Sequence, residues 1–112
     1  MSDTLLLAPL AEPIHLDEVR AHLRAPSGQP GQDAAIRRMI AAARRRVESW
    51  CRRALVRQQR LYVLDCFPAE IEIPVGPLRA VQSIQYVDTA GATQTLAASA
   101  YRVDTYSERA RI

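Results

Sequence analysis

Residues 36–55, IRRMIAAARRRVESWCRRAL, constrain the fold of this chain most, because their apolar side chains recur with the period of an α-helix. At about 100° per residue these side chains fall within one stripe. The stripe consists of Ile36, Met39, Ile40, Ala43, Val47, Trp50, Cys51 and Ala54. Asp33 precedes the stripe and is a good N-cap. We therefore expect a long helix that begins at Asp33 and packs its stripe, Trp50 included, against a core.

Arginine makes up almost all of the polar surface of this expected helix. The seven arginines of residues 36–55 are Arg37, Arg38, Arg44, Arg45, Arg46, Arg52 and Arg53. Three of them lie almost opposite the apolar stripe, and the other four flank it on its two sides. Glu48 is the one acid in this stretch, and it can reach Arg44 and Arg52 at a separation of four residues.

Charge is divided unevenly along the chain. Residues 36–60 hold nine arginines and one acid, a balance of +8, whereas the other residues hold six arginines and eleven acids, a balance of −5. A surface with such an excess of one sign repels itself unless something negative covers it. Nucleic-acid phosphate is one such cover, and it would bring a steep dependence on salt. The acidic remainder of a neighbouring copy is the other, because head-to-tail contacts can close into rings.

The sequence argues against the readout of particular bases. Single-strand binders interleave aromatic and basic residues to stack bases, but this helix holds only Trp50, on its apolar stripe. The segment APSGQPGQ between the helices is too long and too rich in proline for a helix-turn-helix. All seven arginines are candidates for a subunit interface or a DNA channel. They would contact phosphate, or they would pair with a neighbour's acids such as Glu70, Glu72 or Asp88.

The rest of the chain predicts an α+β fold, with two helices followed by a small, mostly antiparallel β-sheet. Pro9 and Pro13 favour an extended arm over residues 1–15. LDEVRAHLR predicts a short helix, which forms a helical hairpin with the long one over residues 16–57. Residues 58–112 are β-rich: we expect strands in RQQRLYVLDCF and EIEIPV, a hairpin of VQSIQYVD and TQTLA, and a strand in AYRVDTY. We expect one structural domain whose C-terminal part is missing, because RARI reads as a strand just beginning.

No pattern in the sequence is typical of an enzyme. His15 and His22 are seven residues apart, about 10 Å along a helix, which is too far to share a metal ion; His15 can instead cap the short helix. The acids are scattered and the glycines form no phosphate-binding loop. Cys51 and Cys66 belong to no CxxC motif, and we expect both to be buried apolar fillers. We predict no catalytic, cofactor-binding or metal-binding residue, no cofactor and no membrane span.

Four segments of moderate specificity follow one another along the chain. They are EPIHLDEVRAHLR, DAAIRRMIAAARRRVESWCRRAL, IEIPVGPLRAVQSIQYVDTAGATQTL and YRVD. In this order they resemble the tailed-phage head–tail connector family, whose members are also called adaptor or head-completion proteins. Relatives of this family occur in bacteriophages, prophages and gene transfer agents. The resemblance extends from about residue 10 to the last residue, and none of its segments is a catalytic signature.

The resemblance implies a structural virion protein. In this family, copies assemble in the bacterial host cytoplasm into a homo-oligomeric ring, typically of about twelve, beneath the portal protein. The ring prolongs the DNA channel, where DNA passes without specific contacts, and it docks the tail or a tail-terminator or stopper protein. Family members usually finish with further helices, into which this sequence does not continue. The residues alone leave an alternative, a small basic nucleic-acid-binding protein without sequence specificity.

Overall fold

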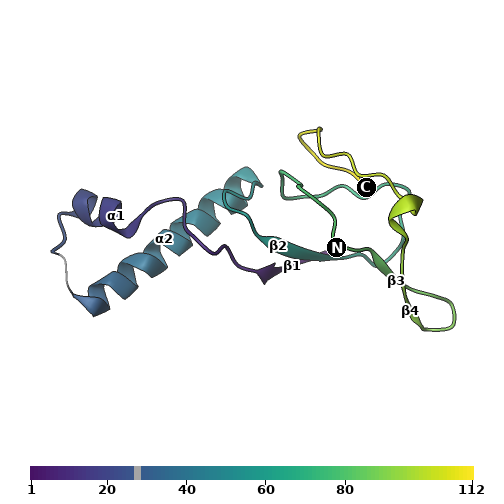
Figure 1. Cartoon of the computed structure of the whole chain (residues 1–112), viewed down its shortest axis with the longest axis horizontal. Helices are drawn as coiled ribbons and strands as arrows, with labels where there is room; N and C mark the ends of the chain where they lie inside the picture. Colours follow the sequence, from purple (N-terminus) through teal and green to yellow (C-terminus); the bar gives the residue numbers. More distant parts are fainter. Residues whose placement is uncertain (27–28) are drawn as a thin grey trace. The chain divides into compact units, whose positions relative to one another are not determined.

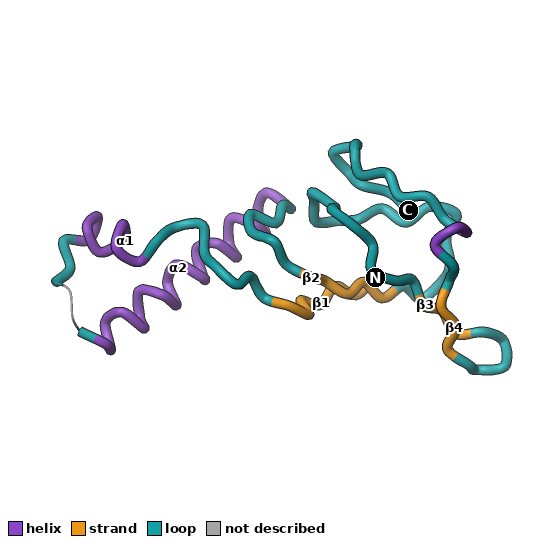
Figure 2. The backbone as a smooth tube through the Cα atoms, in the orientation of Figure 1, coloured by secondary structure: helices purple, strands orange, loops and turns teal. Residues whose placement is uncertain are grey.

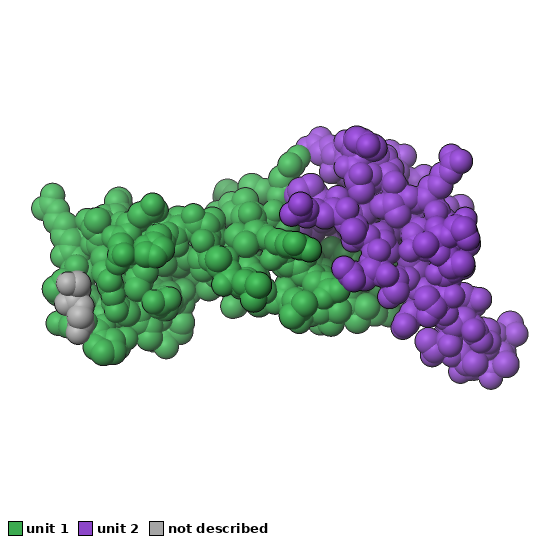
Figure 3. All heavy atoms as spheres, viewed as in Figure 1, with its two compact units in different colours: residues 1–65 green, residues 66–112 purple. Residues whose placement is uncertain are grey.

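The computed structural model describes residues 1–26 and 29–112 (Figure 1). Two helices are followed by small antiparallel sheets, so the predicted α+β arrangement is confirmed (Figure 2). The chain divides into two compact units, Met1–Asp65 and Cys66–Ile112, where the sequence analysis expected one structural domain (Figure 3). The strand pairings explain this division, because each of the two sheets is built from strands of one unit only.

The two predicted helices both lie in the first unit. Helix α1 spans Leu16–Leu23, and His15 is its N-cap, as predicted: its Nδ1 accepts the N–H of Asp17 at 3.3 Å. Helix α2 spans Pro30–Cys51, so the prediction that Asp33 caps it is wrong. Proline suits a first helical turn, because its φ is already helical and the N–H that it lacks would have no partner there.

Asp33 instead joins the two helices. It lies in the first turn of α2, and its carboxylate accepts a hydrogen bond of 3.0 Å from Nε of Arg20 on α1. A second contact joins Nη2 of Arg20 to the other carboxylate oxygen of Asp33. The hydrogen bonds from Arg20 hold the pKa of Asp33 below its usual value.

Part of the expected extended arm is a strand. Strand β1, Ser2–Leu7, pairs antiparallel with β2, Gln59–Val63, with Ser2 opposite Val63. Asp3 and Arg60 reinforce the pairing with two hydrogen bonds of 2.8 and 2.9 Å between guanidinium and carboxylate. Bidentate pairs of this kind are among the stronger side-chain contacts. The N-terminus of the chain is thereby held to the segment that follows α2.

The second unit contains the predicted hairpin. Strands β3, Gln85–Val87, and β4, Thr93–Thr95, pair antiparallel. Oδ1 of Asp88 accepts the N–H groups of Ala90 and Ala92, both at 2.9 Å, and so closes the turn between the strands. Gly91 in this turn has a φ of 83°, which glycine adopts without strain.

The other expected strands of this unit are shorter than predicted. Ile71 and Ile112 exchange two backbone hydrogen bonds, and Arg111 forms isolated antiparallel bridges with Glu72 and Asp104. EIEIPV and AYRVDTY therefore contribute single bridges in place of regular strands. Pro74, which follows Ile73 directly, has no N–H to continue the ladder.

The buried face of α2 differs from the predicted apolar stripe. Its buried side chains stand four residues apart and are Ile36, Ile40, Arg44 and Glu48. The expectation that Trp50 and Cys51 pack into the core is wrong, because both are exposed. The buried face is rotated away from them because polar groups outside the helix receive Arg44 and Glu48.

Candidate interface on helix α2

A buried ionic cluster surrounds Arg44. Its Nε donates to Oε2 of Glu12 at 2.7 Å, and its Nη1 donates to Oε2 of Glu48 at 2.7 Å. The second oxygen of Glu48 accepts the N–H of Leu55 at 2.9 Å and Nε2 of Gln58 at 3.0 Å. The cluster therefore ties α2 to the segment before α1 and to the segment that leads into β2.

This burial changes the role of Arg44. The sequence analysis named Arg44 as a candidate for an interface or a DNA channel, but only 4% of its side chain is exposed. The predicted contact between Glu48 and Arg44 is confirmed. The hydrogen bond that Arg44 donates to Glu12 and the nearby carboxylates raise the pKa of Arg44 further above its usual value. Arg44 therefore stabilises this unit from within and is not available to a partner.

The other six candidate arginines are exposed. They are Arg37, Arg38, Arg45, Arg46, Arg52 and Arg53. Arg52 follows the last helical residue with a left-handed φ of 51°, and its backbone N–H donates to the carbonyl of Glu48. Within residues 1–26 and 29–112, the side chains of Arg38, Arg45 and Arg46 have no hydrogen-bond or ion-pair partner. These three guanidinium groups can therefore receive an anion from outside.

The acids that the sequence analysis offered as a neighbour's partners are engaged within the chain. Glu70 pairs with Arg111 at 3.2 Å, and Glu72 pairs with Arg109 at 2.9 Å. Asp88 accepts hydrogen bonds from Ala90 and Ala92 of its turn and from Gln94 of β4, which hold its pKa below the usual value. A second copy thus offers few free carboxylates to the arginines of α2.

An apolar stripe lies exposed beside Arg46. We call it the outward stripe; it consists of Met39, Ala43, Val47 and Trp50. Trp50 is 84% exposed, Met39 64% and Val47 46%. Arg46 lies within 40° of Trp50 and Met39 around the helix axis, at about 100° per residue. The sequence pattern predicted the shared face of these side chains, but not that the face points outward.

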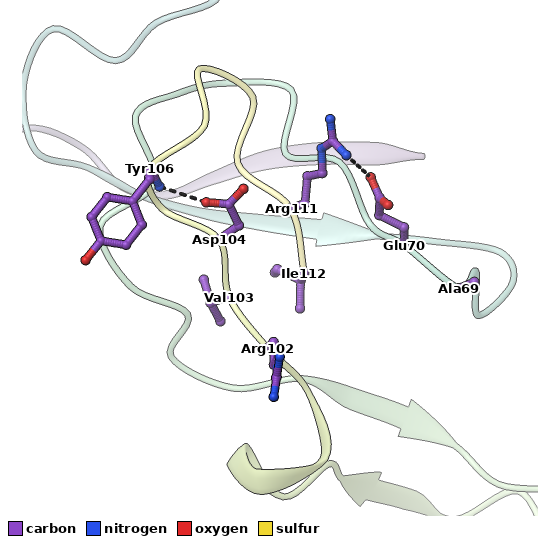
Figure 4. A pocket seen from close by; sticks show the side chains of 8 residues that line it. All are labelled: Ala69, Glu70, Arg102, Val103, Asp104, Tyr106, Arg111 and Ile112. Atoms are coloured by element: carbon purple, nitrogen blue, oxygen red, sulfur yellow. Dashed lines mark hydrogen bonds and ion pairs between the residues drawn. The ribbon is translucent and has the colours of Figure 1, made fainter.

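Other chemistry-bearing groups lie apart from α2. A shallow pocket in the second unit, shown in Figure 4, is lined by Ala69, Glu70, Arg102, Val103, Asp104, Tyr106, Arg111 and Ile112. Its two arginines and two acids balance, and Arg111 already pairs with Glu70. Cys51 and Cys66 are free thiols and are exposed, so the expectation that they are buried fillers is wrong.

The described part of the chain, residues 1–26 and 29–112, contains neither a candidate metal-binding group nor a membrane-spanning helix. No group of three or more His, Cys, Asp or Glu side chains there could hold a metal ion. None of the helices described there is long and apolar enough to cross a membrane. Comparison with protein-family models, with curated proteins and with solved structures found no match to this chain.

Proposed function

We propose that this chain is a structural head–tail connector of a phage or phage-like particle. In this proposal its copies form a ring of about twelve below the portal protein, extend the DNA channel and dock the tail. The order of the segments that resemble the connector family supports the proposal. The protein would act at the head–tail junction of the virion, with no catalytic residue and no cofactor.

One observation carries the proposal furthest: in residues 1–26 and 29–112, α2 presents exposed arginines, Arg38 and Arg45 among them, that have no partner, while most carboxylates are engaged. Arg38 and Arg45 are two helical turns apart, about 10 Å along the axis, and have no partner in residues 1–26 and 29–112. Phosphate suits such a row, because guanidinium binds phosphate oxygens in a bidentate manner. We therefore assign this row to the channel wall, where it contacts passing DNA without reading bases.

A second candidate function is a small basic nucleic-acid-binding protein without sequence specificity. The exposure of Trp50 favours it, because an indole that is 84% exposed beside Arg46 can stack on a base. The apolar stripe of the sequence placed Trp50 in the core and so argued against stacking, but Trp50 is exposed. A groove that binds a single strand stacks successive bases on several aromatic side chains, and α2 has only one.

Salt dependence and stoichiometry separate the two functions. The protein is mixed with duplex DNA and with single-stranded dT20, and binding is followed by fluorescence anisotropy from about 50 to 200 mM salt. A nucleic-acid binder forms a tight complex as a monomer or dimer and loses affinity steeply over this range. A connector binds free DNA weakly at both salt concentrations and forms a defined complex with its portal protein. Tight, salt-sensitive binding without a portal complex would exclude the connector.

A further inference from the structure

We propose that the outward stripe of α2, Met39, Ala43, Val47 and Trp50, is the docking surface for a different protein. The partner surface would be apolar at its centre and lined with carboxylates. This inference goes beyond the connector proposal and does not rest on it, because it depends only on the exposure and charge of α2.

The outward stripe is continuous and exposed. Its members follow one another at separations of three and four residues, so they form one continuous face of the helix. Trp50, Met39 and Val47 are among the exposed large apolar side chains of the described residues. Contiguous exposed apolar surface marks interaction sites on soluble proteins. Trp, Met and Arg are also the residues that protein interfaces favour, and Trp and Arg dominate their hot spots.

Arginine beside the stripe determines the charge of the partner. Arg46 lies one turn before Trp50 and borders the outward stripe, whereas Arg38 and Arg45 lie about 100° or more around the helix from Met39. In the described residues the side chain of Arg46 has no hydrogen-bond or ion-pair partner. A partner that covers the stripe must therefore supply a carboxylate to Arg46, since a guanidinium placed at a dry interface without a counter-charge would be costly.

A second copy of this chain does not fit that requirement. Packing two α2 helices through their outward stripes would bring the arginines of both together. Ten of the twelve acids, moreover, already hold intramolecular interactions: Asp3, Asp17, Asp33, Glu12, Glu48, Glu70, Glu72, Asp88, Asp104 and Glu108. Charge complementarity thus favours a different protein over a second copy.

Nucleic acid fits the stripe less well than protein. Bases bind protein surfaces by stacking on aromatic rings, and groove binders use several rings in succession. Trp50 is the only aromatic residue of α2, and the other stripe members are Met39, Ala43 and Val47. Aliphatic side chains at helical spacing are complementary to the apolar face of another helix, as in helix-in-groove recognition.

Trp50 supplies the readout for a direct test, because it is the only tryptophan of the chain. The probe is a synthetic amphipathic helical peptide with leucine along one face and glutamate on both flanks. We expect a saturable blue shift of the Trp50 emission as peptide is added. The same peptide with lysine in place of glutamate should bind at least tenfold more weakly. Single-stranded dT20 should cause a smaller shift than the acidic peptide.

Variants test whether the stripe itself is the site. Met39→Glu and Arg46→Glu should each weaken peptide binding at least tenfold. Arg79→Glu is the control for Arg46→Glu, because it makes the same change of charge at an exposed position of the second unit. It should leave binding unchanged. Circular dichroism checks that each variant keeps its helix content, which is expected because Met39 and Arg46 are exposed.

Three results would overturn the proposal. One is the absence of any shift with the glutamate peptide. Another is a blue shift that grows with protein concentration when no peptide is present, which would make a second copy the occupant. The third is a larger response to dT20 than to the peptide, which would make the stripe a nucleic-acid site. None of these results depends on a portal complex, so failure here is distinct from failure of the connector proposal.

Discussion

Nη1 of Arg44 lies 2.7 Å from Oε2 of Glu48, and both side chains are buried. The two residues stand one turn apart on α2, and Glu12 holds Arg44 from its other side. A buried ion pair loses much of its Coulombic gain to desolvation, but removal of one partner leaves an uncompensated charge. The cluster therefore holds the segments before α1 and after α2 against α2. It also buries Arg44, whereas the other six candidate arginines are exposed.

Replacing Arg44 tests this separation. Arg44→Ala should lower the free energy of unfolding by about 3–5 kcal/mol, because the carboxylates of Glu12 and Glu48 would lose their shared cation. Arg45→Ala removes the neighbouring, exposed arginine and should change the free energy by about 0.5 kcal/mol or less. Urea unfolding followed by circular dichroism measures both. Equal effects of the two substitutions would contradict the buried cluster.

The proposed channel row gives a prediction for DNA. Each phosphate contact contributes a slope of about 0.9 to the fall of log K with log salt on duplex DNA. The double variant Arg38→Ser and Arg45→Ser should therefore reduce the slope of weak duplex binding by about 1.8. Arg79→Ser with Arg102→Ser removes two exposed arginines of the second unit and serves as the matched control. A larger loss in the control would assign DNA contact to the other unit.

The turn between β3 and β4 should be sensitive to acid. The N–H of Ala92 and the side chain of Gln94 hold the pKa of Asp88 below its usual 3.8. A folded pKa that is depressed adds stability above the unfolded pKa and loses it as the pH falls through the folded value.

Asp88→Asn keeps an acceptor for the turn but removes the charge. The difference in unfolding free energy between wild type and this variant should shrink as the pH falls from about 5 to about 2. Urea unfolding at several pH values measures the difference. A constant difference over this range would show that the charge of Asp88 does not stabilise the turn.

The exposed thiols give a chemical test of the structure. Cys51 and Cys66 are both free and exposed, so a thiol reagent such as dithionitrobenzoate should titrate two thiols per chain in the folded protein. Cys51→Ser and Cys66→Ser should each reduce the count by one without a change in circular dichroism. Reaction only after addition of denaturant would support the buried fillers that the sequence suggested.

Local patterns in the sequence predicted the two helices and the β3–β4 hairpin. The helical periods placed α1 and most of α2, and the alternating segments around TAGA predicted the pairing of β3 with β4. These elements depend on neighbours in the sequence, through i to i+4 contacts or a short turn. The same reasoning predicted the contact between Glu48 and Arg44.

Long-range contacts account for what the sequence did not predict. Arg44 is buried because Glu12, 32 residues earlier, folds back onto it, and no helical pattern contains that information. The first residues form a strand because they pair with β2, and Asp3 meets Arg60, 57 residues later, across this pairing. Trp50 lies on an apolar stripe in the sequence, yet the packed face of α2 is rotated toward Arg44. Periodicity indicates which side chains share a face, but it does not show what covers that face.

Electron microscopy of the protein mixed with the portal protein encoded beside it tests the central proposal most directly. The connector account predicts a ring of this protein below the portal. The row of Arg38 and Arg45 should face the lumen. Free protein without portal binding, together with tight and salt-sensitive binding of DNA, would contradict the account and leave the nucleic-acid binder.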